Sequence, residues 1–204
     1  MQRRAFLMAA PLALAGCGTG GETVWAPEAA IADARYVHAG PPALTLYTVN
    51  NLGTGNGAHS ALLINASQRV LFDPAGSYGH PSIPERNDVL FGMTPQVVKS
   101  YVSYHSRASY VTVEQRLEVP GSIAEAALEL ALSAGPVRQA FCTRAISQLL
   151  GQLPGFETLG TTWFPDKLMA RFGALPGVVT TEHNENDSDS LRDARRAVAR
   201  QLGG

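Results

Sequence analysis

Cys142 and His59 are the residue types of a nucleophilic thiol and its base. The chain has two cysteines and five histidines. Cys142 lies near the start of an expected helix, where the helix N-terminus and a nearby imidazolium favour the reactive thiolate. His59 lies on an expected strand, so the two residues predict thiol nucleophilic catalysis. The alternatives are a buried cysteine that only packs as a small apolar side chain and a satisfied core histidine.

The N-terminal segment has the features of an export signal. It has Arg3 and Arg4, then a short apolar stretch, then Leu14-Ala15-Gly16-Cys17. This order resembles the bacterial lipobox, which implies a signal peptide over 1–16 and a diacylated Cys17; an ordinary signal peptide is the alternative. The two arginines also resemble the twin-arginine export pattern. Since Gly18 is not Asp, the resemblance implies a lipid-anchored protein on the periplasmic side of the cell envelope, at the outer membrane.

Composition excludes several classes of partner. The 204 residues carry 16 Lys and Arg against 17 Asp and Glu, a net charge of -1. That balance gives no basic surface for nucleic acid, and the length suits one domain. No spacing of His, Cys, Asp and Glu completes a metal site, and nothing indicates a cofactor. The acidic run 184–189 lacks the glycine and closing glutamate of a calcium loop, so we expect a solvated turn there.

Periodicity and turn residues predict mixed helices and strands. Residues 17–42 are rich in Gly and Pro and are expected to form a tether, with the domain over 43–183. Beyond it, 184–204 is a polar tail ending in an Arg-rich helix, expected to be peripheral. Expected strands cover 44–49, 58–64, 68–73, 109–114 and 177–181. Expected helices open at Thr94-Pro95, at Ser122 with Glu125 as a capping box, and at Arg138, and a short one runs through Met169 and Phe172. The loop 74–84 is expected to border the site.

The order of these features resembles a known superfamily. A histidine on a strand after a Gly-rich turn, then a hairpin, then a cysteine on a helix, is similar to the circularly permuted NlpC-type branch of papain-like proteins, to which lecithin retinol acyltransferase is related. The resemblance covers Leu44 to Gly151 and implies an α+β fold in which the Cys142 helix packs on an antiparallel sheet. It also implies acyl transfer or hydrolysis through a thioester, on amide or ester bonds of peptidoglycan peptides or lipids. A non-catalytic, lipid-anchored binding module on the same scaffold is the alternative function.

The resemblance also implies a third polar residue, which orients the histidine from the next strand. Asp73 matches that position. With a three-residue turn at 65–67, residue 64 pairs with 68 and His59 pairs with Asp73, so both side chains share one face. Asp73 could instead cap the loop before Pro74, and His80 and Ser77 are then the next candidates. Tyr47 is either an oxyanion donor or a core tyrosine. The remaining histidines, expected at the surface, are His38, His105 and His183.

Overall fold

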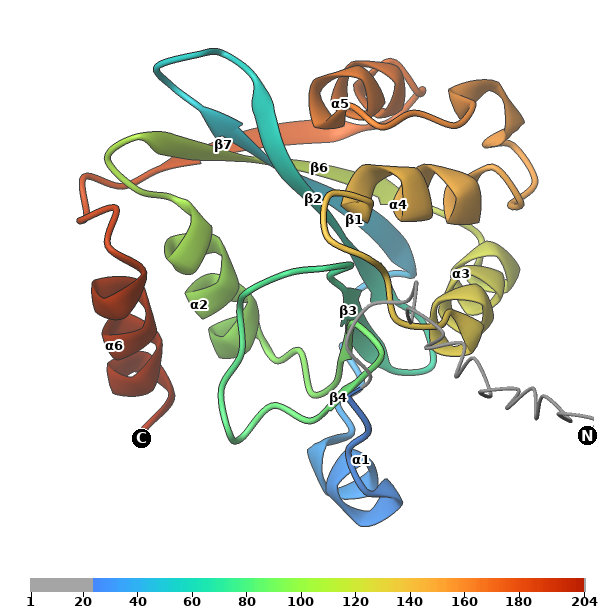
Figure 1. Cartoon of the computed structure of the whole chain (residues 1–204). Coiled ribbons are helices and arrows are strands. Elements are labelled where there is room, and N and C mark those ends of the chain that lie inside the picture. The colour runs from blue at the N-terminus through green and yellow to red at the C-terminus, as the bar shows by residue number, and fades with distance from the viewer. Residues whose placement is uncertain (1–23, 204) are drawn as a thin grey trace, which may run out of the picture.

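The computed structural model describes residues 24–203, which form an α+β fold around one antiparallel sheet (Figure 1). The predicted signal peptide and Cys17 therefore lie outside the described residues. The sheet has seven strands in the order β4-β5-β3-β2-β1-β6-β7. They are β1 (Ala43–Asn51), β2 (Gly57–Asn65), β3 (Arg69–Phe72), β4 (Glu85–Arg86), β5 (Val89–Leu90), β6 (Tyr110–Glu118) and β7 (Val179–Asn184).

The described residues form six α-helices, most of which pack on the two faces of the sheet. They are α1 (Glu28–Ala34), α2 (Pro95–His105), α3 (Gly121–Ser133), α4 (Cys142–Leu150), α5 (Pro165–Gly173) and α6 (Leu191–Leu202), with a short 3₁₀ helix at Glu157–Leu159. Figure 1 shows α3, α4 and α5 on one face and α2 with α6 on the other. None of the helices in residues 24–203 is long and apolar enough to span a membrane.

Side chains along the central strands point alternately to the two faces of the sheet, so the core consists of two apolar clusters, one on each face. Leu62 and Ile64 of β2 point toward α3, α4 and α5 and join the larger apolar cluster. Ala61 and Leu63 point toward α2 and α6 and join the second cluster. Because successive side chains of a strand point to opposite faces, His59 belongs with Ala61 on the α2 side.

The β2–β3 hairpin has the predicted turn length but a different register. Asn65 pairs with Arg69 and Leu62 with Phe72, so the three-residue turn is 66–68 rather than 65–67. The expected direct pairing of His59 with Asp73 is wrong, because the shift moves each partner by two positions. A shift of two preserves the face, so Asp73 still points to the same side of the sheet as His59.

Two segments expected to be peripheral are packed against the domain. Within the expected tether 17–42, residues 28–34 form α1, Ile31 is buried, and Ala26 N donates to Glu85 O at 2.9 Å. The periodicity was too short to predict this helix, whose burial depends on contacts with distant strands. Within the tail, α6 buries three small apolar residues against the α2 side of the core: Ala194, Ala197 and Val198.

Two predicted helix starts also differ. The helix expected from Arg138 begins at Cys142, since a turn precedes it in which Ala140 has a φ of 68°. The predicted capping box at Ser122 does not form. Instead the Glu125 carboxylate accepts hydrogen bonds from the amide and hydroxyl of Ser67. Helix α2 does begin at Pro95 as predicted, and Thr94 caps it by accepting a hydrogen bond from Val97 N at 3.3 Å.

Candidate active site

The structure brings Cys142, His59 and Asp73 together. His59 Nε2 donates to Asp73 Oδ1 at 2.6 Å. The side chains of His59 and Cys142 also interact by a hydrogen bond. The three residues come from β2, from the loop after β3 and from the first residue of α4.

The end of β3 allows a cysteine from one layer to meet a histidine that faces the other. The β2–β3 ladder stops at Leu62–Phe72, so β2 has no neighbouring strand beside Ser60 on that side. The backbone N–H of Ser60 is hydrogen-bonded to Cys142. Backbone N–H groups point along the plane of a sheet, so the sulfur lies beside β2 rather than above one face. From there it reaches the imidazole of His59.

The first turn of α4 is fixed to β2 by hydroxyl groups. Ser60 Oγ and Thr143 Oγ1 are 3.1 Å apart and fully buried, and Thr143 Oγ1 lies 3.8 Å from Cys142 Sγ. The first intrahelical bond of α4 runs from Ala145 N to Phe141 O. The amide of Cys142 therefore precedes that bond, as expected at a helix N-terminus. Free amides and the helix dipole favour negative charge on the sulfur.

Electrostatics favour an ion pair of Cys142 and His59. Burial alone would raise the pKa of the Cys142 thiol, but the hydrogen bond and charge of His59 outweigh it and lower that pKa to about 7. Burial alone would lower the pKa of His59, but Asp73 outweighs it and raises that pKa to about 10. Burial would raise the pKa of Asp73, yet the charge of His59 keeps it below the ordinary value. Between the pKa of Cys142, about 7, and that of His59, about 10, the thiolate and imidazolium forms coexist.

Helix α2 supplies two contacts that sequence analysis missed. Tyr101 OH donates to Asp73 Oδ1 at 3.1 Å. His105, expected at the surface, instead stacks on His59 with ring centroids 5.7 Å apart and an interplanar angle of 13°. His105 Nδ1 donates to Tyr101 O at 3.0 Å. Burial lowers the pKa of His105 to about 4, so a neutral ring lies beside the charged one.

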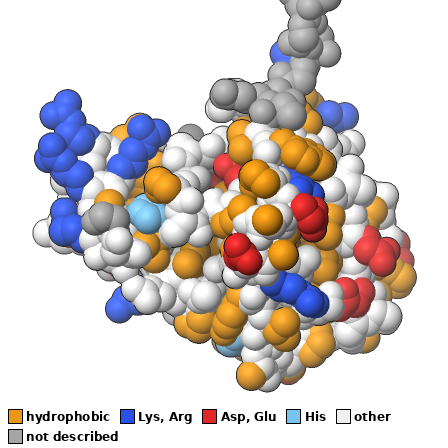
Figure 2. Space-filling view, turned by 90° about the horizontal axis from the view of Figure 1, so that it is seen from below, with side chains coloured by type: hydrophobic (Ala, Val, Ile, Leu, Met, Phe, Trp, Pro, Cys, Tyr) orange, Lys and Arg blue, Asp and Glu red, His pale blue; other side chains and the backbone are white. Residues whose placement is uncertain are grey.

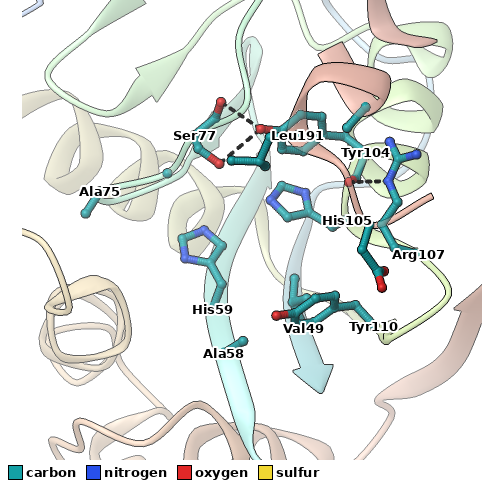
Figure 3. A pocket seen from close by; sticks show the side chains of 13 residues that line it. Val49, Ala58, His59, Ala75, Ser77, Tyr104, His105, Arg107, Tyr110 and Leu191 are labelled. Carbon is teal, nitrogen blue, oxygen red and sulfur yellow. Dashed lines mark hydrogen bonds between the residues drawn. The ribbon is translucent and has the colours of Figure 1, made fainter. Parts of the chain in front are cut away.

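A cavity of about 390 Å³ opens beside His59 on the α2 side of the sheet. Figure 3 shows His59 and His105 side by side at the cavity, with Ser77 and Leu191 nearby. The loop after β3 supplies one wall, so this part of the predicted loop 74–84 does border the candidate site. The opposite wall includes Arg107 and Ala194, from the segment after α2 and from α6. The walls combine apolar side chains with a few polar groups, as ligand pockets do.

The other candidate residues lie elsewhere or make structural contacts. Ser77 lines the cavity, but its hydroxyl is paired with Tyr104 OH at 3.1 Å. His80 Nδ1 pairs with Ser82 Oγ at 2.7 Å. Tyr47 is 1% exposed and packs on Tyr101, which favours the core interpretation. His183 Nε2 pairs with Glu114 Oε2 at 2.8 Å on the outer strands.

The acidic run is also structural. Asp189 accepts hydrogen bonds from the amide and hydroxyl of Ser109, and Asp187 lies 3.6 Å from Arg107 Nη1. Among residues 24–203, no group of His, Cys, Asp and Glu is arranged to hold a metal ion.

Comparison with protein-family models, with curated proteins and with solved structures gave no match to this chain.

Proposed function

We propose that this protein is a thiol hydrolase or acyltransferase with Cys142 as nucleophile, His59 as general base and then acid, and Asp73 as the residue that orients His59. One observation carries the proposal: the imidazole of His59 bridges the carboxylate of Asp73 and the thiol of Cys142 at the N-terminus of a helix. This is the arrangement that activates a thiol and holds the base in one tautomer.

The reaction would proceed in two steps. The Cys142 thiolate attacks the carbonyl carbon of an amide or ester, and the leaving amine or alcohol departs with the proton of His59. The resulting thioester is attacked by water or by an acceptor hydroxyl or amine, whose proton passes to His59, and the thiolate is released. Asp73 stabilises the imidazolium in both steps. Bonds of peptidoglycan peptides or of lipids are the substrates that the sequence resemblance suggests.

The proposal extends to the fold family and to the location of the protein. The order of His59 before Cys142, the hairpin between β2 and β3, and the packing of α4 on β2 support a circularly permuted papain-like fold. The sequence pattern at Cys17 supports a lipid anchor at the envelope. Replacing Cys17 by Ala should then leave a precursor or a soluble envelope protein, and wild-type protein in the cytoplasm with an intact N-terminus would contradict the anchor.

Thiol reactivity tests the proposed site directly. A limiting amount of iodoacetamide at pH 7 should label Cys142 in the wild type, and His59→Ala should slow that labelling by at least tenfold. An activated acyl ester should give one equivalent of acyl-enzyme in the wild type and none in Cys142→Ala. Equal labelling of wild type and His59→Ala, with no acyl-enzyme, would instead favour a non-catalytic binding module.

A further inference from the structure

Exposed aromatic and basic side chains surround the helix start that carries Cys142. Trp163 is 48% exposed and Phe164 is 55% exposed, both in the loop that leads into α5. Large apolar side chains left open to water beside a candidate site suggest an interaction surface. We name this surface the aromatic–cation ridge, and its members are Phe141, Trp163 and Phe164 with Arg138, Arg144 and Lys167.

The basic groups of the ridge lie over aromatic rings. The guanidinium of Arg144 is 5.1 Å from the Trp163 ring centroid, and that of Arg138 is 5.5 Å from the Phe141 centroid. Lys167 Nζ is 4.6 Å from the Phe164 centroid. None of the three cations forms an ion pair with a carboxylate of residues 24–203. Asp166, in the first turn of α5, is the neighbouring carboxylate, so the ridge keeps a net positive charge.

The ridge is held next to the candidate nucleophile. Phe141 immediately precedes Cys142, and its ring packs edge-on against Trp163 with centroids 4.5 Å apart. Thr162 N donates to Ser147 Oγ at 3.1 Å, which fixes the Trp163 loop to α4. The cavity beside His59 lies on the α2 side of the sheet, whereas the ridge belongs to the α4 and α5 layer.

We propose that the aromatic–cation ridge docks on the surface of an anionic phospholipid bilayer, which places the helix start that carries Cys142 beside the contact. Indole rings favour the headgroup level of a bilayer, and Arg and Lys side chains extend from apolar surroundings to phosphate groups. Cations without carboxylate partners are complementary to an anionic leaflet. The role of this contact in catalysis rests on the proposed function, but docking itself can be measured without any catalytic reaction.

The outer face of α6 provides the matched comparison. It carries Arg192, Arg195, Arg196 and Arg200, and Figure 2 shows basic side chains gathered on the side where Figure 1 places α6. No exposed Trp or Phe lies in this helix. If charge alone caused docking, this face would compete with the ridge. If exposed aromatic rings are also required, the ridge would bind and the α6 face would not.

The chain has two tryptophans, and this makes the test specific. Trp25 is exposed and stacks on Arg86 at 4.5 Å, away from the ridge at the edge strand β4. In full-length chain carrying Cys17→Ser and Trp25→Phe, Trp163 is the sole fluorophore of its kind. With vesicles of phosphatidylglycerol and phosphatidylcholine, its emission should shift to the blue and become protected from acrylamide. Vesicles of phosphatidylcholine alone should produce a much smaller change.

Charge variants separate the two surfaces. Replacing Arg138, Arg144 and Lys167 by Gln together should weaken partition into the anionic vesicles by about 100-fold. The same triple replacement at Arg192, Arg195 and Arg200 should weaken it by less than about fivefold, because that face would remain in water. The N-terminal segment is common to all variants, so any adsorption through it cancels. Thermal midpoints check that both triple variants fold.

Three results would overturn the docking proposal. The first is loss of partition in the α6 variant but not in the ridge variant. The second is co-sedimentation with vesicles while Trp163 emission stays unchanged. The third is a ridge that binds purified peptidoglycan sacculi but not vesicles. Iodoacetamide labelling of Cys142 in the same samples keeps the two proposals distinct. If labelling is unchanged but the protein does not partition into vesicles, only the docking proposal fails. If labelling is absent but partition is intact, only the thiol mechanism fails.

Discussion

At Cys142, two opposing effects determine how reactive the thiol is. Burial favours the neutral thiol, while the imidazolium of His59, the N–H of Ser60 and the α4 N-terminus favour the thiolate. The interactions that favour the thiolate outweigh burial, because Asp73 raises the pKa of His59 to about 10 and so keeps the imidazole protonated. The reactive form thus depends on a chain of three side chains, each of which changes the charge of the next.

We predict the pH dependence of the site from these pKa values. Acylation by an activated ester should rise with pH as Cys142 ionises near its pKa of about 7, and fall as His59 deprotonates near its pKa of about 10. The rise and the fall both reflect the coupled titration of Cys142 and His59, so neither pKa belongs to one residue alone. In His59→Ala the alkylation midpoint of Cys142 should rise toward about 8.5, the value of a free thiol. An unchanged midpoint in that variant would show that His59 does not stabilise the thiolate.

Asp73→Asn tests the carboxylate separately from its shape. The amide still fits beside His59 and Tyr101, but it no longer attracts the imidazolium, so acylation should fall by about two to four orders of magnitude. Asp88→Asn is the matched control, because the Asp88 carboxylate accepts hydrogen bonds from the amides of Ala75 and Val137 and its side chain hydrogen-bonds neither His59 nor Cys142. We expect it to lower the thermal midpoint with little change in single-turnover acylation. If Asp73→Asn matches that behaviour, Asp73 has a structural role.

The loop after β3 must let the backbone pass close to Asp73. A Cβ built on Gly76 would overlap the Asp73 carboxylate, whereas one built on Gly79 would meet no atom within 4 Å. Gly76→Ala should therefore displace Asp73, lower acylation by at least about tenfold and destabilise the fold by about 1 to 3 kcal/mol. Gly79→Ala should change stability by less than about 0.5 kcal/mol. Parallel thermal melts and acylation rates check both, and equal behaviour of the two variants would contradict the close packing.

Local signals predicted most of the longer helices and strands but only part of their arrangement. The strands around His59, the start of α2 at Pro95 and the three-residue turn length follow from alternation, Pro and turn residues. Turn length alone determines which face Asp73 occupies. The register could not be predicted, because Asn65 is as good a strand end as a turn residue. The pairing of Leu62 with Phe72 depends on packing in the core, not on the turn.

Contacts between distant elements account for the rest. His105 lies in the last turn of a helix, where sequence alone suggests exposure, and only the packing of α2 on the sheet brings its ring to His59. Tyr101, one turn earlier on the same face, reaches Asp73 for the same reason. Their spacing of four residues was the available signal, because it places both rings on one face of the helix. That face could be assigned to the site only once the sheet was known.

On the scale of the whole molecule, the site joins two layers that the sheet otherwise separates. Cys142 comes from the α4 layer, His59 faces the α2 layer, and they meet where β3 ends. The C-terminal segment completes the α2 layer, since α6 packs on α2 and Leu191 lines the cavity beside His59. A residue far from Cys142 in the sequence can therefore affect both the stability and the binding of substrate.

Val198→Ala tests that link. Val198 is 2% exposed in the second core cluster, so removing two methyl groups should destabilise the protein by about 1.5 to 3 kcal/mol. For a chain of this size the thermal midpoint should fall by about 3 to 12 °C. Loosening of α6 should raise KM for substrates that fill the cavity and leave iodoacetamide labelling of Cys142 unchanged. Val37→Ala removes the same atoms from a side chain that is 58% exposed, and it should alter neither quantity. An unchanged midpoint in Val198→Ala would mean that α6 does not pack on the domain in solution.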